Sequence, residues 1–206
     1  MRNHQIKDIV FDLGGVLIDW DPRYLYKKIF DTGKEVEDFL ENVCTFHWNE
    51  QQDAGRTLQE ATEWLVEQHP AHEENIRAYY DRWEEMLGGV ITGTEDILRG
   101  LHRKNGHGLF ALTNWSAETF PRAQELYAFL ELFQGIVVSG DEKLKKPDRE
   151  IFDVLLERYG LNPETSVFID DNINNIKTAN EMGFNTVHFQ GPEMLKEELE
   201  RVGVSC

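Results

Sequence analysis

The feature that most constrains the fold is an alternation of short apolar runs with helix-like segments after residue 88. Runs at residues 109–112, 135–139, 166–169 and 186–189 are rich in β-prone side chains, which is typical of buried strands. Amphipathic stretches of helical length lie between them. Strands that are joined by crossover helices form a parallel sheet. The sequence therefore predicts an α/β fold with a parallel sheet.

A further strand is predicted at residues 9–11, and it ends in Asp12, followed by Gly14 and Gly15. The glycine pair stops the strand and permits backbone angles that other residues avoid. Open parallel sheets bind their ligands at the carboxyl ends of the strands. The polar residues at those ends, which we predict to converge, are Asp12, Thr113, Asn114, Asp170 and Asp171.

Residues 21–87 carry a helical pattern instead. Thr57 and Glu60 form a capping box, in which each side chain satisfies the other's free backbone N–H at the start of a helix. Apolar residues then recur at helical spacing through Ile76, Tyr80, Trp83 and Leu87. No strand is evident here, so we predict a helical cap domain at 21–87, inserted into a core domain made of residues 1–20 and 88–206.

The charge balance restricts the partners of this chain. Lys and Arg number 21 against 38 Asp and Glu, which gives a formal net charge of −17. Such a surface repels phosphate backbones, so we expect neither a nucleic acid nor an anionic membrane as partner. An anionic small molecule would need a local cation in its binding site.

The cellular location follows from what the sequence lacks. No apolar run approaches the ~18 residues of a membrane span. The first residues lack the apolar stretch of a secretion signal. Cys44 and Cys206 are too few and too far apart for a disulfide framework or a zinc site. We therefore expect a cytoplasmic protein.

Three of the strand-end residues are carboxylates. Asp12 can attack phosphorus to give an aspartyl-phosphate, which splits a difficult hydrolysis into two steps, or it can merely cap the turn that follows. Asp170 and Asp171 are electrostatically unfavourable neighbours unless a cation or donors compensate them. With Asp12 they would form an oxygen-rich site suited to Mg²⁺, although one of them can also cap the helix that starts near Asn172.

The remaining strand-end residues can bind an anion. Thr113 and Asn114 offer a hydroxyl and an amide next to a possible helix start. Lys146 belongs to the sequence Lys143-Leu-Lys-Lys, and such a run is usually a solvated face. Three carboxylates and a phosphate nevertheless require a cation. Trp115 can line a substrate pocket or pack into the core.

The order of these pieces resembles the haloacid dehalogenase (HAD) superfamily over nearly the whole chain. The four motifs of that superfamily look like Asp12-Leu-Gly-Gly-Val-Leu, Leu112-Thr113-Asn114, Lys146-Pro-Asp and Ile169-Asp170-Asp171. The resemblance implies a Rossmann-like doubly wound parallel sheet as the core, and a helical cap that closes over the site and sets substrate choice.

The resemblance also implies a reaction and a cofactor, namely Mg²⁺-dependent hydrolysis of a small-molecule phosphate ester. Asp12 looks like the nucleophile and a metal ligand, and Gly14 would give its backbone carbonyl to Mg²⁺. Asp171 looks like the acidic metal ligand, with Asp170 either a second ligand or the partner of a ligand.

The phosphoryl group would be held by a second set of residues, again by resemblance. Thr113 and Lys146 would bind the phosphoryl oxygens, and Lys146 would also neutralise Asp12. Asn114 would join this phosphate pocket.

One departure from the superfamily concerns acid–base help. Its phosphatases usually carry a second Asp two residues after the nucleophile, and here that position is Gly14. Loss of acid–base help typically costs ~10²–10⁴ in rate, and a good leaving group suffers less. The sequences at Asp12-Leu-Gly14, Thr113-Asn-Trp115 and Asp170-Asp-Asn172 are similar to the bacterial α-glucose-1-phosphate phosphatase branch. This similarity suggests a sugar phosphate such as a hexose 1-phosphate.

The missing acid has three candidate replacements in or beside the insert, which are His47, Asp53 and Asp21. His47 would titrate near neutrality. A histidine between Phe46 and Trp48 is more often a packed residue, however.

Two rival functions remain open at the level of sequence. A 2-haloacid dehalogenase also uses an Asp nucleophile without a second Asp, but it gains nothing from Asp170-Asp171. A catalytically impaired HAD-fold binding protein would explain Gly14, but not the retention of Asp12, Lys146 and Asp171 together.

Overall fold

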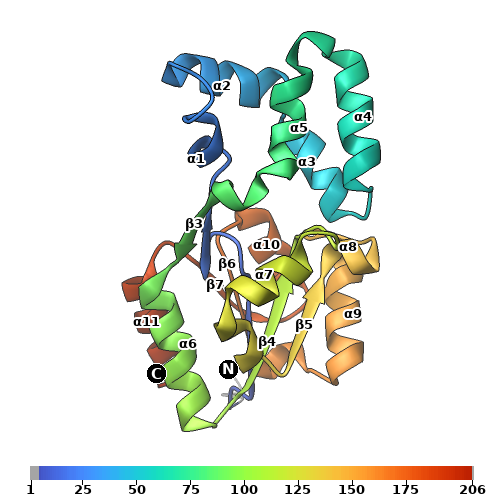
Figure 1. The fold of residues 1–206 in the computed structure, drawn as a ribbon. Coiled ribbons are helices and arrows are strands. Elements are labelled where there is room, and N and C mark those ends of the chain that lie inside the picture. Colours follow the sequence, from blue (N-terminus) through green and yellow to red (C-terminus); the bar gives the residue numbers. More distant parts are fainter. Residues whose placement is uncertain (1–4, 206) are drawn as a thin grey trace.

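The computed structural model describes residues 5–205 (Figure 1). Within that range, one sheet holds five parallel strands in the order β5-β4-β1-β6-β7. These strands are β1 (Asp8–Phe11), β4 (Gly108–Thr113), β5 (Gly135–Val138), β6 (Ser166–Asp170) and β7 (Asn185–His188). The predicted α/β fold with a parallel sheet is confirmed. Residues 1–4 and Cys206, which we predicted to belong to the core, lie outside the described residues.

β1 lies in the middle of the sheet. From β1 the chain adds β4 and β5 on one side, and it later adds β6 and β7 on the other side. In a doubly wound sheet, ligands bind at the carboxyl edge where the strand order reverses in this way. Asp12 directly follows β1, Asp170 ends β6, and Thr113 ends β4. The strand order therefore places these three residues at the edge where a ligand is expected.

Side chains of β1 alternate between two apolar clusters, one on each face of the sheet, as the two-residue period of a strand requires. Ile9 and Phe11 pack in a cluster with residues of α6 (Thr92–Lys104), α7 (Phe120–Leu126) and α11 (Pro192–Arg201). Val10 packs in the other cluster, with α9 (Arg149–Tyr159) and α10 (Ile173–Glu181). Shorter elements on this core are α8 (Ser139–Glu142) and the 3-10 helices η3 (Ala128–Leu132) and η4 (Pro163–Thr165).

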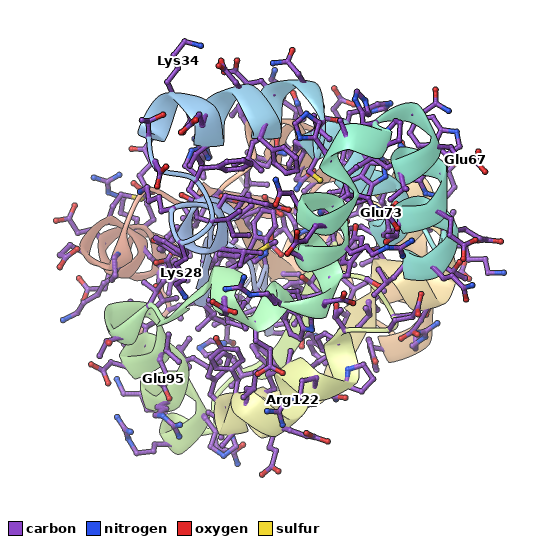
Figure 2. All side chains as sticks on the ribbon, turned by 45° about the horizontal axis from the view of Figure 1, so that its top comes forward. Lys28, Lys34, Glu67, Glu73, Glu95 and Arg122 are labelled. Atoms are coloured by element: carbon purple, nitrogen blue, oxygen red, sulfur yellow. The ribbon has the colours of Figure 1, made fainter. Side chains whose placement is uncertain are left out.

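A group of helices covers the carboxyl edge of the sheet, at the top of Figure 1. It consists of α1 (Arg23–Tyr26), α2 (Gly33–Asn42), α3 (Phe46–Asp53), α4 (Leu58–Gln68) and α5 (Glu73–Asp81), with the 3-10 helices η1 (Pro70–His72) and η2 (Trp83–Met86). The predicted capping box of Thr57 and Glu60 begins α4. Charged side chains such as Lys34 and Glu67 point away from this group (Figure 2).

The helical group has an apolar cluster of its own, in which Tyr26, Phe39, Trp48, Ile76 and Tyr79 are buried. No member of that cluster belongs to the two clusters of the sheet. The division into a cap of residues 21–87 and a core of residues 1–20 and 88–206 stays a prediction, which this separation supports. Among the helices of residues 5–205, none is long and apolar enough to cross a membrane.

Two short strands join the helical group to the core. β2 (Ile18–Trp20) and β3 (Leu87–Val90) pair antiparallel. Neither strand is evident from sequence. Three or four residues are too few to show a period, and Gly88-Gly89 is typical of a break between elements. A Cβ atom at Gly88 would clash with the carboxylate of Asp19, which accepts a hydrogen bond of 2.7 Å from the Tyr24 hydroxyl. The glycine thus makes room for a polar side chain of the paired strand.

Gly140, in α8, yields a test of how the loop after β4 is supported. A Cβ atom at Gly140 would clash with the backbone nitrogen of Ala117 and lie 2.8 Å from the carbonyl oxygen of Trp115. Backbone atoms give way at a larger cost than flexible side chains do. We therefore expect Gly140→Ala to lower the free energy of unfolding by about 1–3 kcal/mol, measured by urea denaturation.

Gly106→Ala is the matched control, because a Cβ atom there meets no atom of residues 5–205 within 4 Å. We expect it to change the free energy of unfolding by about 1 kcal/mol or less. Equal stability of the two variants would contradict the account of the loop.

Candidate active site

Three carboxylates meet at the carboxyl edge of the sheet. Residue 11 of β1 pairs with residue 169 of β6, and the backbone N–H of Asp12 donates to the carbonyl of Ile169 at 2.8 Å. The residues that follow on each strand are consequently neighbours. Oxygen atoms of Asp12, Asp170 and Asp171 all lie within 4.8 Å of one another. The structure thus brings together the three acids that the sequence predicted to converge.

Lys146 lies between two of these acids. Its Nζ is 2.9 Å from Oδ2 of Asp12 and 2.7 Å from Oδ2 of Asp170, and the side chains of Lys146 and Asp170 are completely buried. The interpretation of the lysine run as a solvated face is right for Lys143, which is exposed, and wrong for Lys146. Burial of an ammonium group at this point is tolerable because two carboxylates compensate its charge.

Asn114 fixes the backbone of Lys146. Its side-chain amide donates to the carbonyl of Lys146 at 2.9 Å, and its side-chain oxygen accepts from the Lys146 N–H at 2.8 Å. Asn114 also lines the cavity described below. Its amide is engaged with the lysine backbone, so the first effect of Asn114 is to position Lys146.

Asp170 is saturated with donors. Besides Lys146, its oxygens accept from the backbone N–H of Asn172 at 2.8 Å and from the side-chain amide of Asn175 at 3.0 Å. The residue that caps α10 is Asn172, whose side-chain oxygen accepts from the N–H of Asn174 at 2.9 Å, so the interpretation of one acid as the helix cap is wrong. Sequence reasoning missed Asn175, because a buried asparagine inside a helix pattern gives no signal before its partner is known.

Asp171 is different, because it is exposed and its carboxylate makes no ion pair within residues 5–205. A Cβ atom at Gly15 would clash with the Asp171 carboxylate, and Gly15 has a φ of +71°. The backbone angle favours glycine here, and a side chain at this position would also displace the carboxylate of Asp171. The sequence indicated the turn but not the approach.

Lys146 alone does not offset the negative charge of the three acids. Burial raises the pKa of Asp12 well above its usual range, which Lys146 partly opposes and the carboxylate of Asp170 reinforces. Loss of hydration likewise raises the pKa of Asp171, and the neighbouring Asp170 adds to this. A divalent cation would offset both effects. Oxygen-only donors at this separation fit Mg²⁺, which takes one or two carboxylates together with waters and phosphate oxygens.

Thr113 is buried, and its hydroxyl has no hydrogen-bond partner among the described residues. A buried hydroxyl without a partner is costly, so the position favours a bound ligand or water that satisfies it. This is the behaviour expected of a phosphate contact, although Thr113 is not among the residues that line the cavity.

A cavity of about 380 Å³ opens above Asp12 and Lys146. Gly14, Asp171 and Asn114 contribute to its floor. Its aromatic and apolar wall consists of Trp20, Phe46, Tyr79, Tyr80, Trp83, Met86 and Trp115. Most of these side chains come from the helical insert, so the core supplies charged groups while the insert supplies the wall.

Trp115 is both buried and part of this wall, so the two alternatives considered for it hold together. Its indole N–H donates to the Thr119 hydroxyl at 3.0 Å, and its ring meets Trp83 and Phe120 edge to face. These contacts fix the ring at the boundary between the core and the insert.

The three candidates for the missing general acid differ in whether they line the cavity. Asp53 lines the cavity. His47 does not, and its side chain is 85% exposed. Asp21 also lies outside the cavity lining and accepts hydrogen bonds from Arg23.

Two further polar residues of the lining, Asn49 and Glu50, were not foreseen. They follow Phe46 on α3 at positions three and four residues on, which is one face of a helix. The carboxylate of Glu50 pairs with Lys145 of the core at 2.9 Å. Sequence alone does not indicate which face of a short helix meets a cavity.

The chain is similar to known hydrolases in sequence. A model of haloacid dehalogenase-like hydrolases matches residues 6–183. The sesquiterpene phosphatase astK of Aspergillus oryzae is 26% identical over 182 residues, which cover 88% of this chain and 89% of that protein. A phosphorylated carbohydrates phosphatase of Thermotoga maritima is 26% identical over 186 residues, which cover 87% and 83% respectively.

A solved structure is also similar. A HAD family enzyme from Bacteroides thetaiotaomicron, crystallised in complex with magnesium and inorganic phosphate, is 26% identical. It superposes with a TM-score of 0.68, over 90% of this chain and 95% of that one.

The buried position of Lys146 leads to a stability prediction. Replacing Lys146 by Met leaves Asp12 and Asp170 buried without their cation, and breaking a buried charge pair costs about 3–5 kcal/mol. We expect urea denaturation of Lys146→Met, with a chelator present so that no divalent cation compensates, to show a loss of this size.

Lys145→Met serves as control, since Lys145 pairs with Glu50 at the partly exposed surface. Surface pairs contribute about 0–1 kcal/mol. If both variants lost the same free energy of unfolding, the buried ion pair would not be the stabilising contact that we describe.

Proposed function

The chain belongs to the haloacid dehalogenase-like hydrolase family, and we propose that it is a Mg²⁺-dependent phosphomonoester hydrolase with Asp12 as nucleophile. The observation that carries this proposal is the meeting of Asp12, Asp171 and the buried Lys146 on the floor of one cavity. A nucleophile, an unpaired acid and a fixed cation are the groups that phosphoryl transfer to a carboxylate needs.

In this proposal the phosphoryl group of the substrate lies on the cavity side of Asp12. Its oxygens meet Nζ of Lys146 and the unpartnered hydroxyl of Thr113. An oxygen of Asp12 forms a bond to phosphorus while the bond from phosphorus to the ester oxygen breaks, and the leaving alcohol takes up a proton. Water then attacks phosphorus, which releases inorganic phosphate and regenerates the Asp12 carboxylate.

Asp12, Asp171 and the backbone carbonyl of Gly14 are the groups that would hold Mg²⁺. Bound there, the ion supplies positive charge that lets phosphate approach the carboxylates. Asp170 has its oxygens engaged by Lys146, Asn172 and Asn175, so we assign it to positioning Lys146 rather than to a second ligand position. The related Bacteroides enzyme, crystallised with magnesium and inorganic phosphate, supports this choice of ion.

The residues that line the cavity also indicate which class of substrate it suits. Lys146 is the one cationic side chain among the described residues that line it, so we propose a substrate with a single phosphate group. Aromatic faces together with Asn49, Glu50 and Asp53 suit a sugar, whose C–H faces pack on rings and whose hydroxyls need acceptors. We therefore propose a small sugar phosphate such as a hexose 1-phosphate, in line with the name of the Thermotoga relative.

A second candidate substrate is the phosphate ester of an apolar alcohol. The predominance of aromatic side chains in the wall favours it, and the Aspergillus oryzae relative is named a sesquiterpene phosphatase. Apolar surface contributes to binding roughly in proportion to the area removed from water. The two substrate classes therefore differ in which wall residues they use, the polar ones for a sugar and the rings for an apolar group.

The site gives less support to the rival functions. A departing halide is an anion, and the unpaired carboxylate of Asp171 beside the nucleophile would repel it. A binding protein without catalysis would have no need for Lys146 to be buried against Asp12 at 2.9 Å.

The proposal is tested with a panel of hexose 1-phosphates, prenyl phosphates, aryl phosphates and 2-haloacids, each with Mg²⁺ and with a chelator. We expect phosphate release from at least one ester class, dependent on Mg²⁺, and no halide release. Asp12→Asn should reduce phosphate release to background while calorimetry still detects binding of the ester. Halide release, or phosphate release that survives Asp12→Asn, would overturn the proposal.

A further inference from the structure

The leaving alcohol needs a proton, and the turn that follows Asp12 does not provide one. Gly14, two residues after Asp12, has no side chain, and a Cβ atom there would meet no atom of the described residues within 4 Å. The space beside the nucleophile is thus open rather than filled by a neighbouring residue. In an in-line displacement the leaving oxygen lies on the far side of phosphorus from the attacking oxygen. Here that side is the cavity beneath the helical insert.

Asp53 is the last residue of α3 and lines the same cavity as Asp12, Gly14 and Lys146. The end of α3 is held against the core at two points. Glu50 pairs with Lys145 at 2.9 Å. A Cβ atom at Gly55 would lie 2.8 Å from Cγ of Lys143, which shows how closely the turn after α3 packs on the core. These contacts fix against the core the helix end that carries Asp53 into the cavity lining.

We propose that Asp53 is the general acid that protonates the leaving oxygen, and then the general base that deprotonates the attacking water. This inference rests on the proposed phosphatase function. In the first step the carboxylic acid of Asp53 gives its proton to the ester oxygen as the bond to phosphorus breaks. In the second step the resulting carboxylate removes a proton from water as water attacks the aspartyl-phosphate. Asp53 ends the cycle protonated, as it began.

The surroundings of Asp53 suit this double role. Its carboxyl makes no hydrogen bond or ion pair with the described residues, so it is free to contact a substrate. The charged and titratable groups that face it are Glu50 from its own helix, Lys145 from the core, and Tyr79 and Tyr80 from α5. Burial raises the pKa of Asp53 to about 7, with Glu50 adding to the rise and Lys145 opposing it. Both protonation states are consequently populated near neutral pH.

Other acids of the cavity are less suited. Glu50 is already paired with Lys145. Asp171 lies next to Asp12 and Asp170 on the floor, on the side of the nucleophile rather than of the leaving group.

The test is the dependence of Asp53→Asn on the leaving group. With an alkyl phosphate, whose alkoxide must be protonated as it leaves, we expect kcat/KM to fall by about 10²–10⁴-fold. With p-nitrophenyl phosphate, whose phenolate leaves without a proton, kcat/KM should fall less than tenfold. Equal losses for both substrates would overturn the proposal, because a structural or binding role does not depend on the acidity of the leaving group.

Two variants complete the design. Asn49→Ala is the neighbouring control, since it removes an uncharged group of the cavity lining, and it should change kcat/KM for the two substrates by equal factors. Gly14→Asp places a carboxyl in the open space beside the nucleophile, so in the Asp53→Asn background we expect it to restore part of the lost activity on the alkyl phosphate. Failure to restore any activity in a folded double variant would count against a proton-transfer role.

A measurement on the unaltered protein covers the case in which Asp53→Asn does not fold. The acid form of Asp53 is lost as pH rises through about 7. We therefore expect the ratio of kcat/KM for the alkyl phosphate to kcat/KM for p-nitrophenyl phosphate to decrease above that pH. A ratio independent of pH would overturn the inference. Absence of hydrolysis of every ester in the panel described above would instead refute the proposed function itself.

Discussion

The structure depends on one buried ion pair network, in which Lys146 lies between Asp12 and Asp170. The two acids come from the ends of adjacent strands, and the lysine comes from the segment between α8 and α9. Asn114, at the end of β4, holds the lysine backbone through two hydrogen bonds. Four segments that are remote in sequence thereby meet around one charge. A buried charge is tolerated only when its partners compensate it closely. The side chains around Lys146 therefore have little conformational freedom, and the geometry of the site is defined before any ligand binds.

The two parts of the chain contribute different groups to the site. The parallel sheet positions the charged groups, since a carboxyl edge gathers the ends of β1, β4 and β6. The helical insert adds the aromatic wall and Asp53, and it contacts the core through Glu50 and Lys145. The chemistry at phosphorus thus belongs to the core, while the fit of the leaving group belongs to the insert. Changes in the wall should alter substrate choice and leave the nucleophile undisturbed.

Much of this arrangement follows from the sequence, because strand periodicity and acids at strand ends are local signals. Asp12, Asp170 and Asp171 could be placed at one edge once a parallel sheet was predicted. Properties that depend on neighbours in the tertiary structure could not be predicted from the sequence. Lys146 resembles the solvated Lys143 in sequence, and only its approach to two carboxylates distinguishes it. The close contact between Gly15 and Asp171, the bond from Asn175 to Asp170 and the pairing of β2 with β3 are likewise tertiary facts.

The central claim is that Asp12 becomes phosphorylated during turnover. Acid quenching of the protein during steady-state hydrolysis, followed by peptide mass spectrometry, tests it most directly, because an acyl phosphate survives in acid. We expect a phosphoryl group on the peptide that contains Asp12, present only when both Mg²⁺ and a phosphate ester are supplied. A phosphoryl group on another residue, or turnover with no phosphorylated peptide at any quench time, would contradict the account.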